Sequence, residues 1–225
     1  MLNLNQETPY DNLPLDDFKN TVLSCQQCEL CHTRTNVVFG SGPIPCNLMI
    51  IGEGPGEQED LQSLPFVGRS GKLLTKILEY VSINRDTDVF IANTVKCRPP
   101  NNRTPLKAEI DSCKPYLIRQ IKLVKPKILL LLGSPSLKTI LEETLTITKT
   151  RGKWYKTIVD YMSDPLYIMP LFHPSYLLRN SSQEEGKPKW LTWQDMKEVK
   201  SLEIDFSKDY ILEKLVKLKK EISVI

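Results

Sequence analysis

The sequence predicts an α/β protein, a three-layer α/β/α arrangement with a central four-stranded parallel sheet. Short apolar runs of strand length alternate with longer segments whose apolar residues recur at helical spacing. The run at residues 127–132 is apolar after its first residue, which is typical of a strand buried on both faces. Polar or glycine-rich residues follow each run. Because right-handed crossovers align the carboxyl ends of parallel strands, we expect these residues to meet at one edge of the sheet.

The predicted strands are residues 47–51, 88–95, 127–132 and 167–172. Pro170 places the last strand at a sheet edge or marks a local irregularity, because proline has no N–H for a neighbouring strand. The segment before it, residues 146–164, is predicted to be irregular or β-rich.

Helical spacing predicts a helix on either side of most strands. We interpret Ser70 as the N-cap of one helix, and Thr104 as the N-cap of a long helix with Pro105 at its first position. The predicted helices are residues 15–25, 71–81, one from 104, one from 133, and two charged amphipathic helices at 189–199 and 207–222.

Length and composition are those of an ordinary globular protein. The chain has 225 residues, of which 40% are hydrophobic and 25% charged. We expect one domain at 1–206 and a helical extension at 207–225. No apolar run approaches the ~20 residues that span a bilayer, and the first residues lack the pattern of a signal peptide, so we expect no membrane association. A formal charge of +3 is weak evidence for a nucleic-acid partner.

Cysteine spacing points to a metal site. Without an export signal, disulfides are a poor first interpretation. Cys25 and Cys28 form a C-x2-C pair, and fifteen residues separate Cys97 from Cys113. Four thiolates can hold a [4Fe–4S] cluster or a structural zinc ion, and the long second spacing favours the cluster. The two other cysteines are expected to be spare, Cys31 as an alternative ligand and Cys46 as a core residue.

An acidic, glycine-rich loop follows the first strand. Gly52 and Gly54 let backbone N–H groups approach a ligand closely, and Glu53 lies between them. Glu59 follows in the same loop. Phe66 lies in a turn-rich context, where its ring either belongs to the core or stacks on a planar ligand.

Two polar residues at strand ends carry further predictions. Asn93 is set among apolar residues, so it either makes a structural hydrogen bond or reads the N3–H and O4 edge of uracil with its amide. His173 directly follows the last strand, where it can stabilise charge on a substrate oxygen. The other histidine, His32, is given no role.

Basic residues and leucines around this edge suggest nucleic-acid contact. Of Leu177 and Leu178, which we expect in a loop, one is expected to wedge into a base stack and the other to fasten the loop to the core. The basic residues suited to phosphate contact are Arg98, Arg103, Arg179, Lys72 and Lys96.

Four segments, in matching order, resemble the family 4 uracil-DNA glycosylases, which are the iron–sulfur enzymes of their superfamily. The segments are residues 52–60, 65–69, 93–100 and 173–179. The resemblance extends over about residues 20 to 200 and includes both cysteine pairs. One departure stands at Gly54, where many members have alanine and related families carry a water-activating Asp or Asn. That leaves Glu53 as the nearest carboxylate by sequence.

The resemblance implies a role for each matching residue. Phe66 would stack on a flipped uracil, Asn93 would read its edge, and His173 would stabilise the departing uracil anion at O2. Glu59 would exclude the thymine methyl group, and Leu177 would fill the gap left in the DNA. The implied [4Fe–4S] ligands are Cys25, Cys28, Cys97 and Cys113.

The expected function is therefore hydrolysis of the N-glycosidic bond of uracil in single- or double-stranded DNA, which initiates base excision repair. Gly52 and Gly54 are expected to line the substrate pocket, with Glu53 and His173 as catalytic residues. We expect a cytoplasmic monomer that associates with the nucleoid when it acts on DNA. The alternative is an iron–sulfur DNA-binding or redox-sensing module without glycosylase activity. The expected DNA contacts are Arg98, Ser175, Leu177 and Arg179.

Overall fold

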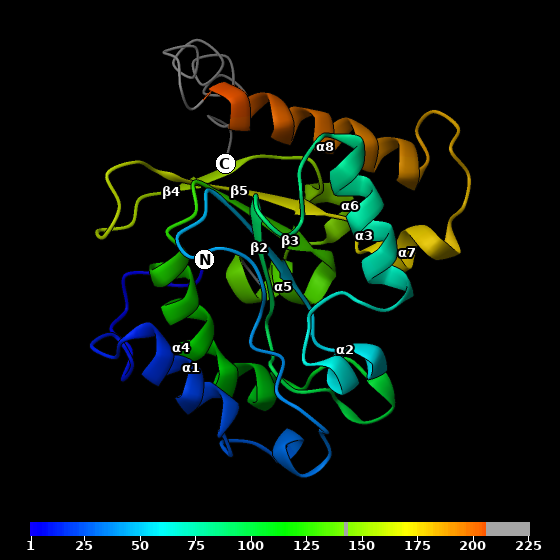
Figure 1. Cartoon of the computed structure of the whole chain (residues 1–225). Coiled ribbons are helices and arrows are strands. Elements are labelled where there is room, and N and C mark those ends of the chain that lie inside the picture. The colour runs from blue at the N-terminus through cyan, green and yellow to red at the C-terminus, as the bar shows by residue number, and fades with distance from the viewer. Residues whose placement is uncertain (142–143, 206–225) are drawn as a thin grey trace.

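The computed structural model describes residues 1–141 and 144–205, and its centre is a five-stranded sheet with the order β2-β1-β3-β5-β4 (Figure 1). Four strands are parallel, as predicted, and β4 is an antiparallel edge strand in the segment that was expected to be irregular or β-rich. The strands are β1 (Leu48–Gly52), β2 (Val89–Asn93), β3 (Ile128–Leu132), β4 (Tyr155–Thr157) and β5 (Leu166–Leu171).

Helices form the two outer layers of the described structure. The α-helices are α1 (Leu15–Leu23), α2 (Glu57–Gln62), α3 (Arg69–Tyr80), α4 (Lys107–Val124), α5 (Gly133–Ile140), α6 (Ile147–Thr150), α7 (Pro174–Arg179) and α8 (Pro188–Asp205). Two 3₁₀ helices are η1 (Glu29–His32) and η2 (Pro100–Asn102). The predicted helix 207–222 and the extension 207–225 lie outside the described residues, so the domain boundary at 206 stays a prediction.

The two faces of the sheet have separate cores. Alternating residues of β1 point to opposite faces. Met49 and Ile51 belong to a core with α1, α4 and α5, while Leu48 and Ile50 belong to a core with α3 and α8. Figure 1 shows these two groups of helices on opposite sides of the sheet. Burial on both faces explains why the central strands are continuous apolar runs.

Both predicted N-caps are wrong. Helix α3 begins one residue after Gly68, so Ser70 lies inside it. Helix α4 has Leu106 at its N-cap position instead of Thr104. The carboxylate of Glu109, in the first turn of α4, accepts the Leu106 N–H at 2.7 Å. A side chain from within the helix thus accepts the N–H of the N-cap residue, which is one of the two bonds of a capping box.

Pro170 does not mark an edge strand, because β5 pairs with β3 on one side and β4 on the other. The pairing with β4 ends opposite Ile168. Beyond that point the carbonyl of Pro170 accepts the N–H of Gly152 at 2.9 Å. The irregularity is therefore local, which was the other predicted alternative, and it falls where no partner strand requires an N–H.

The strand order fixes where a ligand can bind. Strands β2 and β3 lie on opposite sides of β1, so the order in which strands are added to the sheet switches from one side of β1 to the other. Such switch points leave a crevice outside the carboxyl ends of the strands. Gly52, Asn93, Gly133 and His173 stand at or just after the ends of the four parallel strands. The predicted polar residues therefore gather at one edge of the sheet.

No helix of residues 1–141 and 144–205 is long and apolar enough to cross a membrane.

Candidate active site and cysteine cavity

Two neighbouring cavities open at the carboxyl edge of the sheet. One is about 480 Å³ and is lined by the glycine-rich loop, Phe66 and Asn93. The other is about 670 Å³ and lies between α4, α5 and α7. The residues that line both cavities are Glu53, Pro105, His173, Ser175 and Arg179. We call the cavity of about 480 Å³ the ring pocket, because the ring of Phe66 forms one of its walls.

Phe66 is held in an unusual backbone conformation. Its φ is 52°, in the left-handed region that bulky residues rarely adopt, and its side chain is 6% exposed. Arg85 fixes this turn, donating to the carbonyl of Phe66 at 2.7 Å and to that of Pro65 at 2.6 Å. Gly71 is needed here because any Cβ would collide with the Phe66 carbonyl. The ring consequently sits 5.8 Å from that of His173, centroid to centroid.

The carboxylate of Glu59 fastens the same loop. One oxygen accepts the N–H groups of Val67 and Gly68 at 2.9 and 2.8 Å, and the other accepts the N–H of Gly56 at 3.1 Å. Three backbone donors fill most of its acceptor capacity. Glu59 is therefore a brace for the loop that carries Phe66, although it also lines the ring pocket.

Asn93 ends β2 with its side chain buried in the ring pocket. The residue is 2% exposed, and its Oδ1 has no hydrogen-bond partner in the described structure. A buried acceptor without a partner costs roughly 1–3 kcal/mol, so the arrangement suits a ligand that supplies a donor. A Cβ at Gly52 would collide with Asn93 Oδ1 and with the ring of Phe66. Only glycine at this position lets the two side chains face the same space.

His173 is the N-cap of α7, and its tautomer follows from its contacts. Its Nδ1 accepts the backbone N–H of Ser175 at 3.2 Å and lies 2.8 Å from the Ser175 hydroxyl. A backbone amide can only donate, so the proton of the neutral ring is on Nε2. Burial, together with the positive charge of Arg179, lowers the pKa of His173 to about 4. The ring is thus a neutral donor at pH 7.

Glu53 lines both cavities and is the acidic residue nearest to the end of β1. Burial raises the pKa of its carboxyl, and a hydrogen bond from Thr104 opposes that shift. The backbone carbonyl of Glu53 accepts the Val95 N–H at 3.3 Å and the hydroxyl of Thr94. The position of Glu53 is therefore set by the chain that follows β2.

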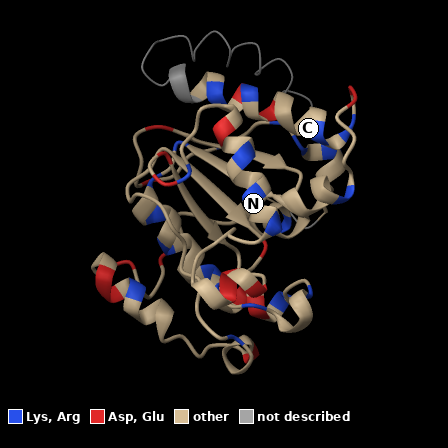
Figure 2. Ribbon diagram, turned by 45° about the vertical axis from the view of Figure 1, so that its right-hand side comes forward, with Lys and Arg blue, Asp and Glu red and all other residues tan. Residues whose placement is uncertain are grey.

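The predicted DNA contacts are spread over different environments. Arg179 and Ser175 line both cavities. Arg98 lies outside the lining of either one, donates to Asn102 Oδ1 at 2.7 Å and is 3.9 Å from Glu57. Figure 2 shows Lys and Arg residues interspersed with Asp and Glu over the ribbon. Charge alone therefore does not mark one binding face.

Two predicted contacts disagree with the structure. Leu177 lies in α7, not in a loop, and its side chain is 1% exposed. Because it is buried in the protein core, it does not face the DNA gap that it was predicted to fill. Its neighbour Leu178 is 38% exposed. Lys96 is 1% exposed and cannot contact phosphate from the surface. Helical geometry explains the leucines, because consecutive residues point about 100° apart around a helix.

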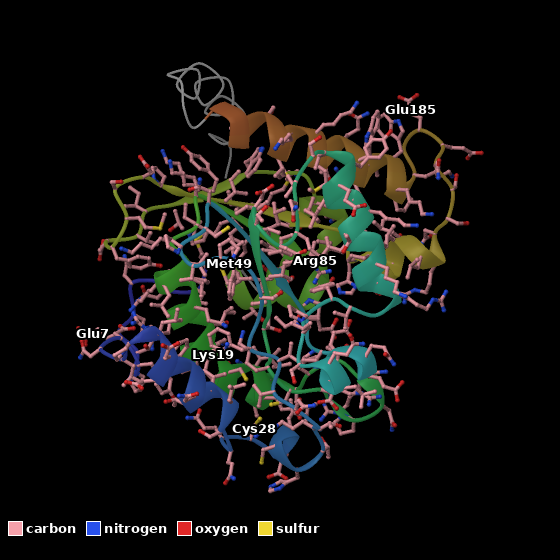
Figure 3. The ribbon with its side chains drawn as sticks, in the orientation of Figure 1. Glu7, Lys19, Cys28, Met49, Arg85 and Glu185 are labelled. Carbon is pink, nitrogen blue, oxygen red and sulfur yellow. The ribbon has the colours of Figure 1, made fainter. Side chains whose placement is uncertain are left out.

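The four predicted ligand cysteines line one small cavity between the end of α1 and the middle of α4; Cys28 is labelled in Figure 3. Cys31 and Cys46 are absent from its lining, and Cys46 instead lies 3.3 Å from the carbonyl oxygens of Leu48 and Asp88. The cysteines that share the cavity are Cys25, Cys28, Cys97 and Cys113.

Two cations face the same cavity. Arg34 donates to Cys97 Sγ at 3.1 Å and to the carbonyl of Cys25 at 2.6 Å. The Nζ of Lys96 donates to the backbone carbonyl of Asn93 at 2.6 Å. In the described part of the chain, no three His, Cys, Asp or Glu side chains converge closely enough to hold one metal ion. The four thiols border one cavity, and four thiolates can hold a [4Fe–4S] cluster or a zinc ion.

Sequence patterns missed two residues that organise these sites. Arg85, which holds the turn at Phe66, lies in a polar stretch with no motif. Arg34 follows the C-x2-C pair but reaches Cys97 far along the chain. Neither arginine had a detectable signal, because each acts on a segment that only the folded chain brings near.

Comparison with known proteins agrees with the fold. Residues 39–197, more than half of the chain, match the family model described as the uracil DNA glycosylase superfamily. The chain therefore belongs to this superfamily of α/β proteins. Several curated relatives match over most of the chain and narrow the assignment. Within the superfamily the protein belongs to the type-4 uracil-DNA glycosylases.

Two relatives illustrate the match. The chain is 41% identical to the type-4 uracil-DNA glycosylase of Sulfurisphaera tokodaii over 206 residues, 88% of this chain and 90% of the relative. It is 42% identical to the type-4 enzyme of Thermotoga maritima over 181 residues, which cover 80% of this chain and 90% of the relative.

Proposed function

We infer that this protein is a uracil-DNA glycosylase, an enzyme of DNA repair that hydrolyses the N-glycosidic bond between uracil and deoxyribose. Family membership supports this function, and the side chain of Asn93 is the observation that carries it within the site. Its buried Oδ1 has no hydrogen-bond partner within the described part of the chain, and the residue lines the pocket beside the ring of Phe66. A flipped uracil has a flat face for Phe66 and an N3–H that fits this acceptor.

The chemistry of the site follows from charge separation. As the glycosidic bond stretches, the sugar becomes an oxocarbenium ion and uracil becomes an anion. The Nε2–H of neutral His173 then donates to the uracil oxygen O2, where charge develops. A neutral ring serves well here, since it stabilises the anion without depending on a proton from solution.

Water must then attack C1′ of the sugar, and the freed uracil takes up a proton. We assign the positioning of this water to Glu53, which lines both cavities and whose carboxyl is otherwise bonded to Thr104. Glu59 is less suited to this step because three backbone N–H groups occupy its oxygens. Its bracing of the Phe66 loop favours a steric role, consistent with the exclusion of the thymine methyl.

We also assign a [4Fe–4S] cluster to the cysteine cavity. Its four thiols fit such a group, and the two cations beside them, Arg34 and Lys96, fit its negative charge. When bound, the cluster would link three segments of the chain. These are the loop after α1, through Cys25 and Cys28, the loop after β2, through Cys97, and helix α4, through Cys113. We expect a structural role for it.

The partner is uracil-containing DNA. We propose that single strands and duplexes both serve, that the protein acts as a monomer, and that it is cytoplasmic. The alternative function, a DNA-binding or redox-sensing module without catalysis, is not favoured, because the type-4 relatives are glycosylases by name.

A uracil-release assay tests the function directly. Purified protein is incubated with oligonucleotides that carry one uracil, either single-stranded or opposite guanine, and free uracil is measured. We expect release from these substrates and none from matched DNA with thymine. Absence of release from every uracil substrate, with the cluster present by iron analysis, contradicts the proposal.

Loss of Arg85 should weaken uracil recognition. The Arg85→Met variant retains much of the apolar stem but removes both hydrogen bonds that hold the Pro65–Phe66 turn. We expect KM to rise about tenfold with a smaller change in kcat, as for a misplaced stacking ring. Arg85→Lys, which keeps one donor, should lie between the two. Equal KM values for Arg85→Met and the parent would show that the turn holds without the arginine.

The leucine that enters the DNA can be identified by a pair of variants. We assign the wedge to exposed Leu178 and a core role to buried Leu177. Leu178→Ala should reduce uracil release from duplex DNA about tenfold, with less effect on single strands, because only the duplex must be unstacked. Leu177→Ala should instead lower the free energy of unfolding by about 2–5 kcal/mol. Duplex activity that falls only in a stably folded Leu177→Ala variant would reverse the assignment.

A further inference from the structure

Lys96 connects the cysteine cavity with the ring pocket. Its side chain is 1% exposed and lines the cavity that holds the four cysteines. The Nζ of the same side chain donates to the backbone carbonyl of Asn93 at 2.6 Å. Asn93 in turn lines the ring pocket, and its buried Oδ1 has no hydrogen-bond partner among the described residues. One buried side chain thus contacts elements of both sites.

The charge of Lys96 needs an anion nearby. Burying an unpaired ammonium is costly, so buried lysines are paired or neutral. None of the ion pairs in residues 1–141 and 144–205 includes Lys96. Its side chain shares the cysteine cavity with Cys97 and Cys113, and no Asp or Glu is among the described residues that line this cavity. Cysteines that ligate a metal group do so as thiolates, so the bound group would be the natural counter-charge of this lysine.

Arg34 provides an internal comparison. It is the second cation of the cavity, and it reaches Cys97 Sγ and the carbonyl of Cys25. Neither of these two bonds reaches β2 or Asn93. Arg34 and Lys96 thus share the same anionic neighbours, but Lys96 alone of these two cations also holds the strand end that carries the base-reading amide.

We propose that Lys96 is a positioning residue that fixes Asn93 for uracil recognition, with its ammonium anchored by the negative charge of the cysteine-held group. The inference rests on the proposed function, since it assumes that Asn93 reads uracil. In this proposal the negative group fixes the position of the Lys96 ammonium. The ammonium then fixes Asn93 by donating a hydrogen bond to its backbone carbonyl. The metal site then supports the geometry of the base pocket through one side chain.

The test compares Lys96→Met with Arg34→Met in the protein that holds its cluster. Each loses one cation beside the cavity, so the midpoint potential of the cluster should fall in both variants, because a nearby cation favours the reduced form. Only Lys96→Met also loses the contact with Asn93. Its dissociation constant for free uracil, measured by equilibrium dialysis, should rise about tenfold, and by more than that of Arg34→Met.

Further results decide the matter. The proposal is overturned if Lys96→Met keeps both the midpoint potential and the uracil dissociation constant of the parent. It is also overturned if Lys96→Met and Arg34→Met have equal dissociation constants for uracil. If Lys96→Met does not retain iron, the comparison is made with Lys96→Gln, which is neutral and similar in length. If the parent neither releases nor binds uracil, the proposed function itself fails, and the inference fails with it.

Discussion

Replacing His173 with alanine is expected to lower the rate of uracil release about 10²–10³-fold, the effect of removing one preorganised donor to a developing anion. The ring is held by the Ser175 amide and hydroxyl, so its Nε2–H has a fixed direction. Single-turnover release from uracil-containing single strands measures this loss. Iron content should stay close to that of the parent, because His173 lies outside the cysteine cavity.

His173→Gln is the matched control, since an amide can still donate near the same place. We expect this variant to recover part of the lost rate. Release at the parental rate by His173→Ala would remove the histidine from the mechanism and leave Asn93 and the backbone as the remaining donors.

The pH dependence follows from the lowered pKa of His173. Burial favours the neutral ring, so the pKa falls from its ordinary 6.5 to about 4. In the unfolded chain the ring takes up a proton near pH 6.5, so this residue favours the native state fully above that pH. The contribution decreases as the pH falls from 6.5 to about 4. Denaturation of the parent and His173→Gln at pH 7 and 5 should show a larger loss for the parent.

Replacing Cys113 with alanine is expected to have the largest effect on stability. Cys113 is 4% exposed in α4 and shares the cavity with Cys97 and the C-x2-C pair. Metal binding to such a site contributes directly to the free energy of folding. We expect Cys113→Ala to lose bound iron and more than about 4 kcal/mol of unfolding free energy. Iron and sulfide analysis, visible absorbance and denaturant titration measure these losses.

Cys31→Ala is the control for this experiment, because Cys31 is near the pair in sequence but outside the cavity lining. It should retain iron and visible absorbance. Loss of iron from Cys31→Ala, together with full retention by Cys113→Ala, would exchange their roles and contradict the assigned ligand set. If the parent binds zinc instead of iron, the site is a structural zinc site, which the cysteine spacing also allows.

Local patterns predicted the framework well. Each of the four parallel strands falls within about two residues of its predicted position, because a strand buried on both faces must be apolar along its length. The positions of Gly52, Asn93 and His173 at strand ends also followed from the pattern. Parallel topology then brought them to one edge.

Local patterns failed at two helix caps and at the short edge strand. Ser70 and Thr104 have the chemistry of N-caps, yet Gly68 and Leu106 precede the helices. The antiparallel strand β4 is three residues long, too short for a periodic signal. Helix α4 takes its cap contact from Glu109 in its own first turn, whereas β4 forms by pairing with β5, a contact that its own three residues do not reveal.

The sequence by itself determined the α/β class, the parallel strands, the cysteine pairs and the motifs of the family. These depend on residue type and spacing, which are properties of the chain alone. Only the tertiary structure decided which side chains are buried and what they contact: Leu178 is exposed while Leu177 is not, and Lys96 joins two sites instead of facing solvent. Burial is set by segments distant in sequence that pack together, so no local pattern contains it.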